Sequence, residues 1–359
     1  MKMDLILHPG HGKCGSSSVQ KFLYDNRAVL QAAGVAVPDR FLHFRFEKTC
    51  DFSVQQPAVS YLSKLANQGK SSLLEKRLET AIEHAEQSDI HTFIISAENL
   101  SSWPTRSLHD IFSKYFNVKK VLYYIRRQDE YLLSAWQQWG HKSGKKFAEY
   151  CQVQLRIGHP TYTANARMLE SHYGKGILEV APFARNAFHN QDLISDFLVR
   201  TGLDNLSNLK STSSIENVSL SPLVCDYLAQ FPDIYTSAHD NYPKVSLEKF
   251  KSSEPWLFEP GKDYLSTSMR RSILNHFDVL NRDLHAAYFP DISFDLLFGL
   301  SASDPKDRQE HLPKSLEKQQ LEFLDHWVKK WVGSKKIRSF LTSKAGMIQN
   351  VRKHLARSK

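Results

Sequence analysis

The chain has 359 residues, of which 41% are hydrophobic and 24% charged, a balance that excludes a disordered or fibrous protein and allows a substantial core. The formal net charge is +9, but ten Lys or Arg and no Asp or Glu lie between residues 326 and 359. The rest of the chain is therefore close to neutral, and this distribution gives no indication of a nucleic-acid partner.

Neither a zinc site nor a membrane span is expected from the residue pattern. The cysteines lie far apart, without the spacing of metal ligands, which favours a reduced, cytoplasmic setting; they are Cys14, Cys50, Cys151 and Cys225. The longest apolar runs fall well short of the ~20 residues that a membrane-spanning helix needs. The apolar run at the N-terminus is also too short for a signal peptide, so we interpret it as a first β-strand.

Strand-like and helix-like segments alternate along the first two hundred residues. The expected order is a strand at 5–7, a helix at 17–33 ended by Gly34, a helix at 71–88, a strand at 92–96, a helix at 107–115, a strand at 121–125, a helix at 129–142, a strand at 177–183 and a helix at 191–202. This alternation predicts an α/β fold with a parallel sheet. A Ser- and Asn-rich loop or junction is expected at 210–221, followed by helices at 223–230 and 270–288.

The most informative motif lies between the first strand and the first helix, where residues 8–18 read HPGHGKCGSSS. Glycines allow a tight turn, and the N–H groups at a helix N-terminus attract a phosphate or sulfate. Gly10 and Gly15 have the spacing of the ATP and GTP pattern GxxxxGK[ST], but Ser16 stands where that pattern has Lys. The lysine is Lys13, inside the loop. A loop of this kind suits the transfer of a less charged group, such as sulfuryl, with Lys13 neutralising the leaving phosphate oxygen. The alternative, a Gly/Ser-rich turn that only caps a helix, stays open.

The motif resembles the 5'-phosphosulfate loop of sulfotransferases that use 3'-phosphoadenosine 5'-phosphosulfate (PAPS). That loop typically reads KTGTT or KSGTT, and here it reads KCGSS, with Cys14 in place of Thr or Ser. The family also has an Arg at the end of a later strand and a Ser eight residues on, which match Arg126 and Ser134. The segments FIISAENLS, VAPFARNAFHNQDLISDFLVRTG and NRDLHAAYF are similar to bacterial members that modify carbohydrates.

The resemblance implies a fold, a donor and an acceptor. The expected fold is a P-loop-like three-layer arrangement, with a central parallel sheet flanked by helices over residues 1–300 and a basic helical extension at 301–359. PAPS would be the co-substrate without a metal, and the acceptor would be a hydroxyl of a glycan or polysaccharide precursor. The expected donor-binding residues are Lys13, Cys14, Gly15, Ser16, Ser17, Ser18, Arg126 and Ser134. The alternatives are a P-loop nucleotide-dependent kinase and a non-catalytic glycan- or nucleotide-binding protein.

Lys13, Glu98 and Arg126 each follow a different predicted strand. Ligands of parallel α/β sheets bind beyond the carboxyl ends of the strands, so we expect these three side chains to face one crevice. Glu98 is the candidate general base, with a pKa raised by burial. His8 and His11 are the alternative bases. Arg127 should point away from Arg126 and form an ion pair or lie at the surface.

Three further features have two interpretations each. Tyr131, Trp136 and Trp139 form an aromatic cluster that would stack on sugar rings or, as we favour, pack in the core. Cys14 is either a redox-sensitive thiol or a small buried filler. Leu324, Trp327, Val328, Trp331 and Val332 have helical spacing, with Lys329, Lys330, Lys335 and Lys336 elsewhere on the surface. That segment is either a helix packed on the body or a peripheral contact with the inner membrane face.

Overall fold

The computed structural model describes residues 2–39, 41–43, 58–101, 105–210, 219–261, 263–300 and 315–333. The chain divides into two compact units. The first comprises Met1–Tyr131, Leu155–Glu216 and Arg271–Ser301, and the second comprises Leu132–Gln154, Asn217–Arg270 and Ala302–Lys359. Among the described residues, no helix has the length and apolar character needed to cross a bilayer. The predicted boundary between residues 300 and 301 adjoins 301–314, which lie outside the described residues.

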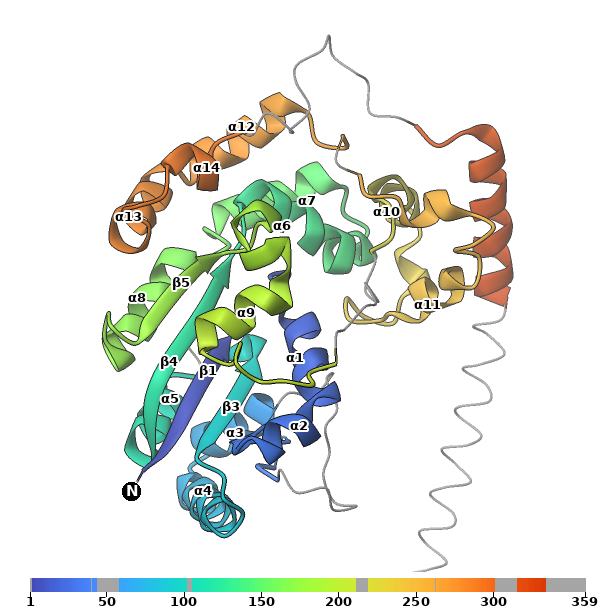
Figure 1. Ribbon diagram of the computed structural model, residues 1–359. Helices are drawn as coiled ribbons and strands as arrows, with labels where there is room; N and C mark the ends of the chain where they lie inside the picture. Colours follow the sequence, from blue (N-terminus) through green and yellow to red (C-terminus); the bar gives the residue numbers. More distant parts are fainter. Residues whose placement is uncertain are drawn as a thin grey trace, which may run out of the picture. The chain divides into compact units, whose positions relative to one another are not determined.

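The first unit is built around a sheet of five parallel strands, which confirms the predicted α/β class (Figure 1). The strands are β1 (Met3–Pro9), β2 (Val35–Ala36), β3 (Thr92–Ala97), β4 (Phe116–Ile125) and β5 (Leu178–Pro182), in the spatial order β2-β3-β1-β4-β5. After β1 the chain builds β2 and β3 on one side, and it then crosses to β4 and β5 on the other. The strand order thus reverses at β1.

Helices cover both faces of this sheet because alternate residues of each strand are buried on opposite sides. Leu5 and Leu7 of β1 pack in one apolar cluster, and Ile6 packs in another. The first cluster receives apolar side chains from α3 (Ala58–Asn67), α4 (Ser71–Glu86), α5 (Arg106–Tyr115), α8 (Tyr162–Tyr173), α13 (Asp278–Tyr288) and α14 (Phe294–Phe298). The second receives them from α1 (Ser16–Asp25), α2 (Arg27–Ala32) and α9 (Leu193–Thr201).

The predicted helix at 17–33 is wrong as a single element, because the chain bends between α1 and α2. Asn26 separates them, and its side chain donates to the carbonyls of Phe22 and Lys210 and accepts the Lys210 N–H. A distant segment therefore sets this break, which local periodicity does not reveal. Similarly, the predicted helix at 270–288 is divided at the buried Phe277 into α12 (Thr267–His276) and α13. The helices α7 (Phe147–Arg156) and α8 were not expected.

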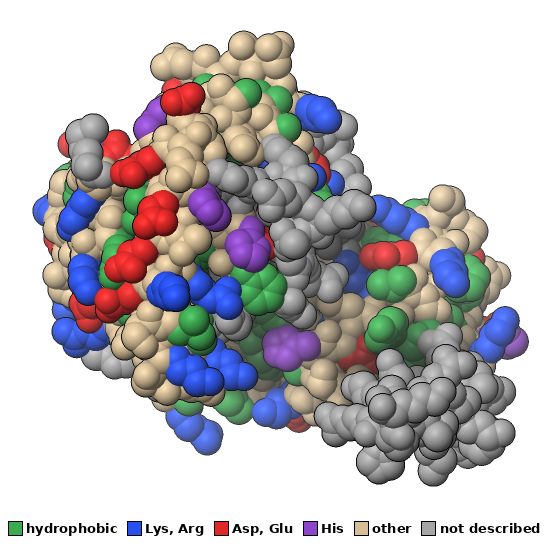
Figure 2. Space-filling view, turned by 90° about the horizontal axis from the view of Figure 1, so that it is seen from below, with side chains coloured by type: hydrophobic (Ala, Val, Ile, Leu, Met, Phe, Trp, Pro, Cys, Tyr) green, Lys and Arg blue, Asp and Glu red, His purple; other side chains and the backbone are tan. Residues whose placement is uncertain are grey.

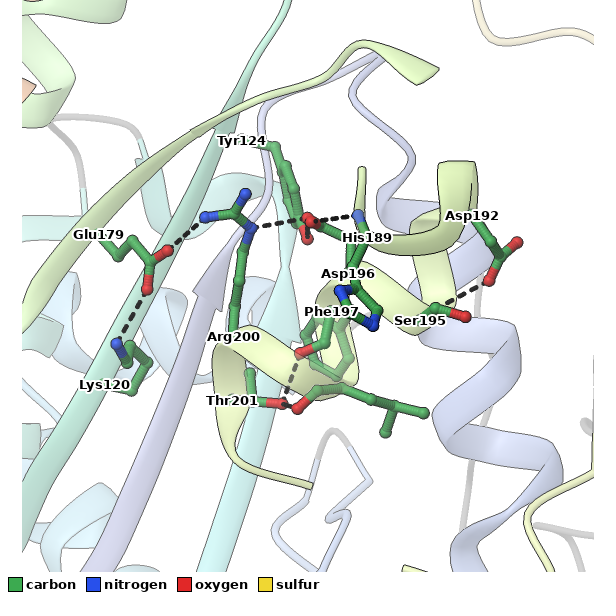
Figure 3. A network of polar contacts seen from close by, with 11 residues as sticks. Lys120, Tyr124, Glu179, His189, Asp192, Ser195, Asp196, Phe197, Arg200 and Thr201 are labelled. Carbon is green, nitrogen blue, oxygen red and sulfur yellow. Dashed lines mark hydrogen bonds and ion pairs between the residues drawn. The ribbon is translucent and has the colours of Figure 1, made fainter. Parts of the chain in front are cut away.

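A polar network joins α9 to the last two strands (Figure 3). The carboxylate of Asp196 accepts from the Tyr124 hydroxyl at 2.7 Å and from the Arg200 guanidinium at 2.7 Å. Arg200 also bonds Glu179 of β5, which accepts from Lys120 of β4 at 2.9 Å. The buried carboxylate of Asp196 thus has a charged partner, as burial of a charge requires, and the other three charged side chains are half-buried. The network holds α9 against the face of the sheet on which α1 also packs.

The second unit is helical among its described residues. It contains the end of α6 (Gln128–Ala135), a π-helical turn at Trp136–Gly140, a 3-10 turn at His141–Ser143, most of α7, α10 (Pro222–Leu228), α11 (Tyr242–Glu248), the start of α12 and a helix at 318–333. Trp136 is fully buried and stacks on Tyr264, with ring centroids 5.6 Å apart. Tyr131, in the first unit, is also buried. Core packing is therefore confirmed for these two aromatics, while Trp139 is half-buried.

The helix at 318–333 packs on the second unit through its apolar face. Leu324, Trp327, Val328 and Trp331 are buried. Trp331 donates its indole N–H to the Ile234 carbonyl, and Asp325 bonds the Tyr227 hydroxyl. The packed-helix interpretation is thus confirmed for this segment, with Lys329, Lys330 and Val332 exposed. Lys335, Lys336 and the remainder of the basic extension lie outside the described residues, so contact with a membrane stays a prediction.

Candidate active site

The loop after β1 curls back on itself before α1 begins. Lys13 and Gly15 both have positive φ, at 65° and 77°. The His11 carbonyl accepts two bonds, from the Cys14 N–H at 3.1 Å and from the Ser16 hydroxyl at 3.2 Å. Because these bonds close the turn over one carbonyl, the loop has a defined shape that brings Lys13 to the start of α1.

Two glycines of the loop are required by geometry. A Cβ on Gly15 would lie 2.5 Å from Leu193 and 2.6 Å from Phe183, in addition to the strain of its positive φ. A Cβ on Gly10 would lie 2.3 Å from the Ser16 hydroxyl oxygen. The loop therefore packs closely against α9 and the residue after β5 at Gly15, and against the first residue of α1 at Gly10.

The start of α1 offers hydrogen-bond donors to an anion. The first N–H groups of a helix lie at the positive end of the helix dipole and generally lack an intrahelical acceptor. In α1 the Ser18 N–H already donates to the Gly15 carbonyl at 2.9 Å. Ser17 and Ser18 are exposed in this first turn, whereas the side chain of Ser16 is buried. Gly15 caps the helix in the left-handed conformation, with no side-chain cap. The arrangement is compatible with the predicted anion cradle, and anion binding stays a prediction.

Glu98 lies directly after β3 and adjoins the same loop. Burial raises the pKa of its carboxyl, while the charge of Lys13 and a hydrogen bond with Ser16 oppose this rise. Ser101, at the end of the same 3-10 turn, donates to the Gly10 carbonyl at 3.2 Å. Side-chain hydrogen bonds of Ser16 and Ser101 thus connect the loop to the turn that begins at Glu98.

Arg126 lies directly after β4 and reaches the loop from its other side. Its guanidinium donates to the Lys13 carbonyl at 3.4 Å and to Glu130 at 3.1 Å, and it lies over the Phe183 ring with 5.6 Å to the centroid. These bonds use two of the five N–H donors of an arginine fork. Arg127 instead pairs with Asp129 at 2.7 Å and donates to the Gly299 carbonyl, so the expected ion pair is confirmed.

The three charged residues therefore converge where the strand order reverses. Lys13 follows the central β1, and Glu98 and Arg126 follow its two neighbours, β3 and β4. The crevice at the carboxyl ends of strands next to such a reversal is the usual ligand site of open parallel sheets. Two cations and the helix N-terminus there favour an anion, although Glu130 already pairs with Arg126. Glu98 is the carboxylate next to the loop and to Lys13.

Cys14 takes part in the internal packing of the loop. Its thiol is fully buried, its N–H donates to the His11 carbonyl, and burial raises the pKa of the thiol to about 12. A contact of Cys14 with PAPS stays a prediction. The elevated pKa also removes the redox-sensitive interpretation, because the thiolate is the reactive form. Cys14 is a buried filler.

His8 and His11, the alternative bases, are enclosed by aromatic side chains. His8 is fully buried against Tyr124 and Phe197 and shares a hydrogen bond with Ser96. His11 packs among the rings of Tyr123, Tyr131, His159 and Tyr162. Burial lowers the pKa of both imidazoles to about 4. Both rings are accordingly neutral near pH 7, and their surroundings indicate a structural role.

The other predicted donor-binding residue, Ser134, lies on α6 within the second unit and is half-buried. Its role stays a prediction. Phe183, which sequence reasoning did not single out, contacts both Gly15 and Arg126. A signal was available, because Phe183 directly follows β5 and therefore lies at the same edge of the sheet as the other site residues.

Among the described residues, no group of three or more His, Cys, Asp or Glu side chains is arranged to hold a metal ion. A scan against models of protein families finds no match for the chain, and a search of curated proteins finds no significant relative. The functional interpretation therefore depends on the residues and the geometry of the chain itself.

Proposed function

We propose that this protein is an enzyme that transfers a sulfuryl group from PAPS to a hydroxyl of an acceptor, a glycan or polysaccharide precursor. The observation that supports it most is the convergence of Lys13, Glu98 and Arg126 around the loop that precedes α1. The parallel sheet and the position of the loop between β1 and α1 support this proposal, in which the loop binds the 5'-phosphosulfate of the donor.

Each residue has a proposed part in this reaction. The N–H groups at the start of α1, with Ser17 and Ser18, bind the 5'-phosphosulfate, and Arg126 binds the 3'-phosphate. Glu98 accepts the proton of the acceptor hydroxyl as its oxygen bonds to sulfur. The bond from sulfur to the 5'-phosphate oxygen breaks, and Lys13 stabilises the charge that develops on that oxygen.

Calorimetry with 3'-phosphoadenosine 5'-phosphate (PAP) and with ATP tests the donor. We expect PAP to bind tightly without magnesium and ATP to bind weakly, because a kinase loop has its lysine after Gly15 and uses a metal. The reverse preference would support a nucleotide-dependent kinase instead.

Transfer of labelled sulfur from PAPS to a panel of glycans then tests catalysis. Labelled product that disappears in Glu98→Gln is the expected result. Tight PAP binding without transfer to any hydroxyl acceptor would favour a non-catalytic binding protein on the same scaffold.

A further inference from the structure

The Ser16 side chain lies between the candidate base and the loop. It is buried, at 2% exposure, on the first residue of α1. Its hydroxyl donates to the His11 carbonyl at 3.2 Å. The place of a Cβ on Gly10 lies 2.3 Å from Ser16 Oγ and 3.6 Å from Glu98 Cα, so Ser16 and Glu98 approach the same point. A hydrogen bond from Ser16 accordingly opposes the rise of the Glu98 pKa. The hydroxyl therefore has two fixed partners in a confined position.

A serine hydroxyl has one proton to donate and two lone pairs to accept with. When Glu98 is charged, its carboxylate can only accept, so the contact between them requires Ser16 to donate to Glu98. When Glu98 is protonated, its hydroxyl can donate to Ser16 Oγ, and Ser16 can then donate to the His11 carbonyl. The two protonation states of Glu98 thus require opposite orientations of one O–H bond.

We propose that Ser16 is a positioning residue whose hydroxyl proton turns from the His11 carbonyl to Glu98 when Glu98 loses its proton, and turns back when Glu98 gains one. This inference rests on the proposed function, in which Glu98 is the base. The Ser16 O–H bond does not break at any point. The proton that Glu98 gains is the proton of the acceptor hydroxyl.

The cost of this exchange is small because the His11 carbonyl keeps a second donor. The Cys14 N–H bonds that carbonyl at 3.1 Å in either orientation. Reorienting the hydroxyl therefore leaves no buried acceptor unsatisfied, which would otherwise destabilise one state. The loop keeps its shape while the hydrogen bond offered to the base changes.

Two other groups lie near Glu98. Lys13 acts on the carboxylate by charge, which favours the same ionised state. The Cys14 thiol lies close enough to interact with Glu98 and has Arg126 and Tyr162 among its own neighbours. Ser16 differs from both because its hydroxyl can donate or accept as the base changes its protonation state.

The test is a titration of the Glu98 carboxyl in the full chain, without nucleotide. The probe is carbon NMR of protein with ¹³C-labelled glutamate carboxyls, and Glu98→Gln assigns the signal. Because Ser16 stabilises the charged form, Ser16→Ala should raise the pKa of Glu98 by about one unit, a tenfold change in the protonation equilibrium. Ser16→Cys, with a weaker donor, should give a smaller rise.

Ser96→Ala is the matched control, since it removes a hydroxyl from the same strand end, two residues before Glu98. Ser96 bonds His8 rather than the loop, so the Glu98 titration should not move. An unchanged or lowered Glu98 pKa in Ser16→Ala, or an equal rise in Ser96→Ala, overturns the proposal. These readings do not depend on the donor, so a failure of PAP binding would refute the proposed function separately.

The pH profile of turnover gives the second readout. If labelled sulfur is transferred, the acid limb of kcat should move to higher pH in Ser16→Ala by the same amount as the NMR titration, with a smaller change in KM. A limb that stays in place while activity falls at every pH would show a merely structural role and would also overturn the proposal.

Discussion

The charged side chains at the two edges of the central sheet differ in how deeply they are buried. At the carboxyl edge, Glu98 is largely enclosed, its pKa is raised by burial, and Lys13 and Arg126 reach the same loop. At the amino edge, the pairs Lys114–Glu75 and Lys119–Asp4 lie in solvent, with more than half of each lysine side chain exposed. In the view from below, acidic and basic side chains both lie on the surface (Figure 2).

This difference indicates where the chain can perform chemistry. Exposed ion pairs are screened by water and contribute little. Buried charges lose hydration that their pairing only partly restores, so their presence at the carboxyl edge is typical of a functional site rather than of a stabilising ion pair. The backbone conformation supports this inference, because Lys13 and Gly15, which both have positive φ, lie at the carboxyl edge. Five experiments test this contrast.

The largest effect is expected from Glu98→Gln. Loss of a general base should lower kcat by about 10³-fold, with PAP binding retained. In the wild type, activity should fall as pH drops through the raised pKa of Glu98, since the base must be ionised.

A raised folded pKa also means that the ionised group opposes folding, so Glu98→Gln should be more stable than wild type at pH 7 and equal to it below about pH 4. Urea unfolding at both pH values checks this, and a variant that is less stable at pH 7 would contradict it.

Lys13→Ala should lower the rate of transfer by about 10²-fold, because it removes the charge that stabilises the leaving oxygen. PAP affinity should fall less than kcat, since backbone N–H groups provide much of the cradle. Single-turnover kinetics separates the two quantities. An equal loss in binding and in rate would mean that Lys13 holds the donor without acting on the leaving group.

Gly15→Ala should destabilise the first unit by about 2–4 kcal/mol, the sum of left-handed strain and overlap with Leu193 and Phe183. Gly202 is the matched control: it has a φ of 71° at the end of α9, and a Cβ there would meet nothing within 4 Å. Gly202→Ala should cost only the strain, about 1 kcal/mol. Equal losses in urea unfolding would refute the close packing of the loop.

Acid should destabilise the protein through its buried imidazoles. The pKa of His8 is about 4 in the folded chain, against about 6.5 when unfolded. Stability is therefore present above pH 6.5 and is lost as pH falls toward 4, by about 3 kcal/mol for this residue. His8→Gln should reduce the loss between pH 7 and pH 4, measured by urea midpoints, whereas His239→Gln, at an exposed position, should leave it unchanged.

The smallest effect is expected at the amino edge. Lys119→Ala removes the same charge as Lys13→Ala, but its partner Asp4 is 3.8 Å away and partly exposed. The variant should match wild type in PAP binding and turnover, and it should lose at most about 1 kcal/mol of stability. A tenfold loss of turnover would remove the distinction between the two edges.

Much of the sheet and the site follows from local patterns. The buried runs of β1, β3 and β4 are continuous and apolar, as strands covered on both faces must be. Glu98 and Arg126 come directly after such runs, and Lys13 lies in the loop after another. The two-residue β2 is too short to leave a pattern. The break at Asn26 depends on Lys210, 184 positions later, so no local window of sequence contains its cause.

The amino-acid sequence was sufficient to place Lys13, Glu98 and Arg126 at one edge of the sheet, because parallel strands have their carboxyl ends together. The pKa values, the burial and the contacts of the site residues depend on the tertiary structure. Burial sets the direction of the Glu98 pKa, the close approach of Gly10 fixes Ser16 beside it, and enclosure withdraws Cys14, His8 and His11 from solvent. Such effects arise from atoms that the fold brings together from distant segments, and the order of residues does not specify their distances.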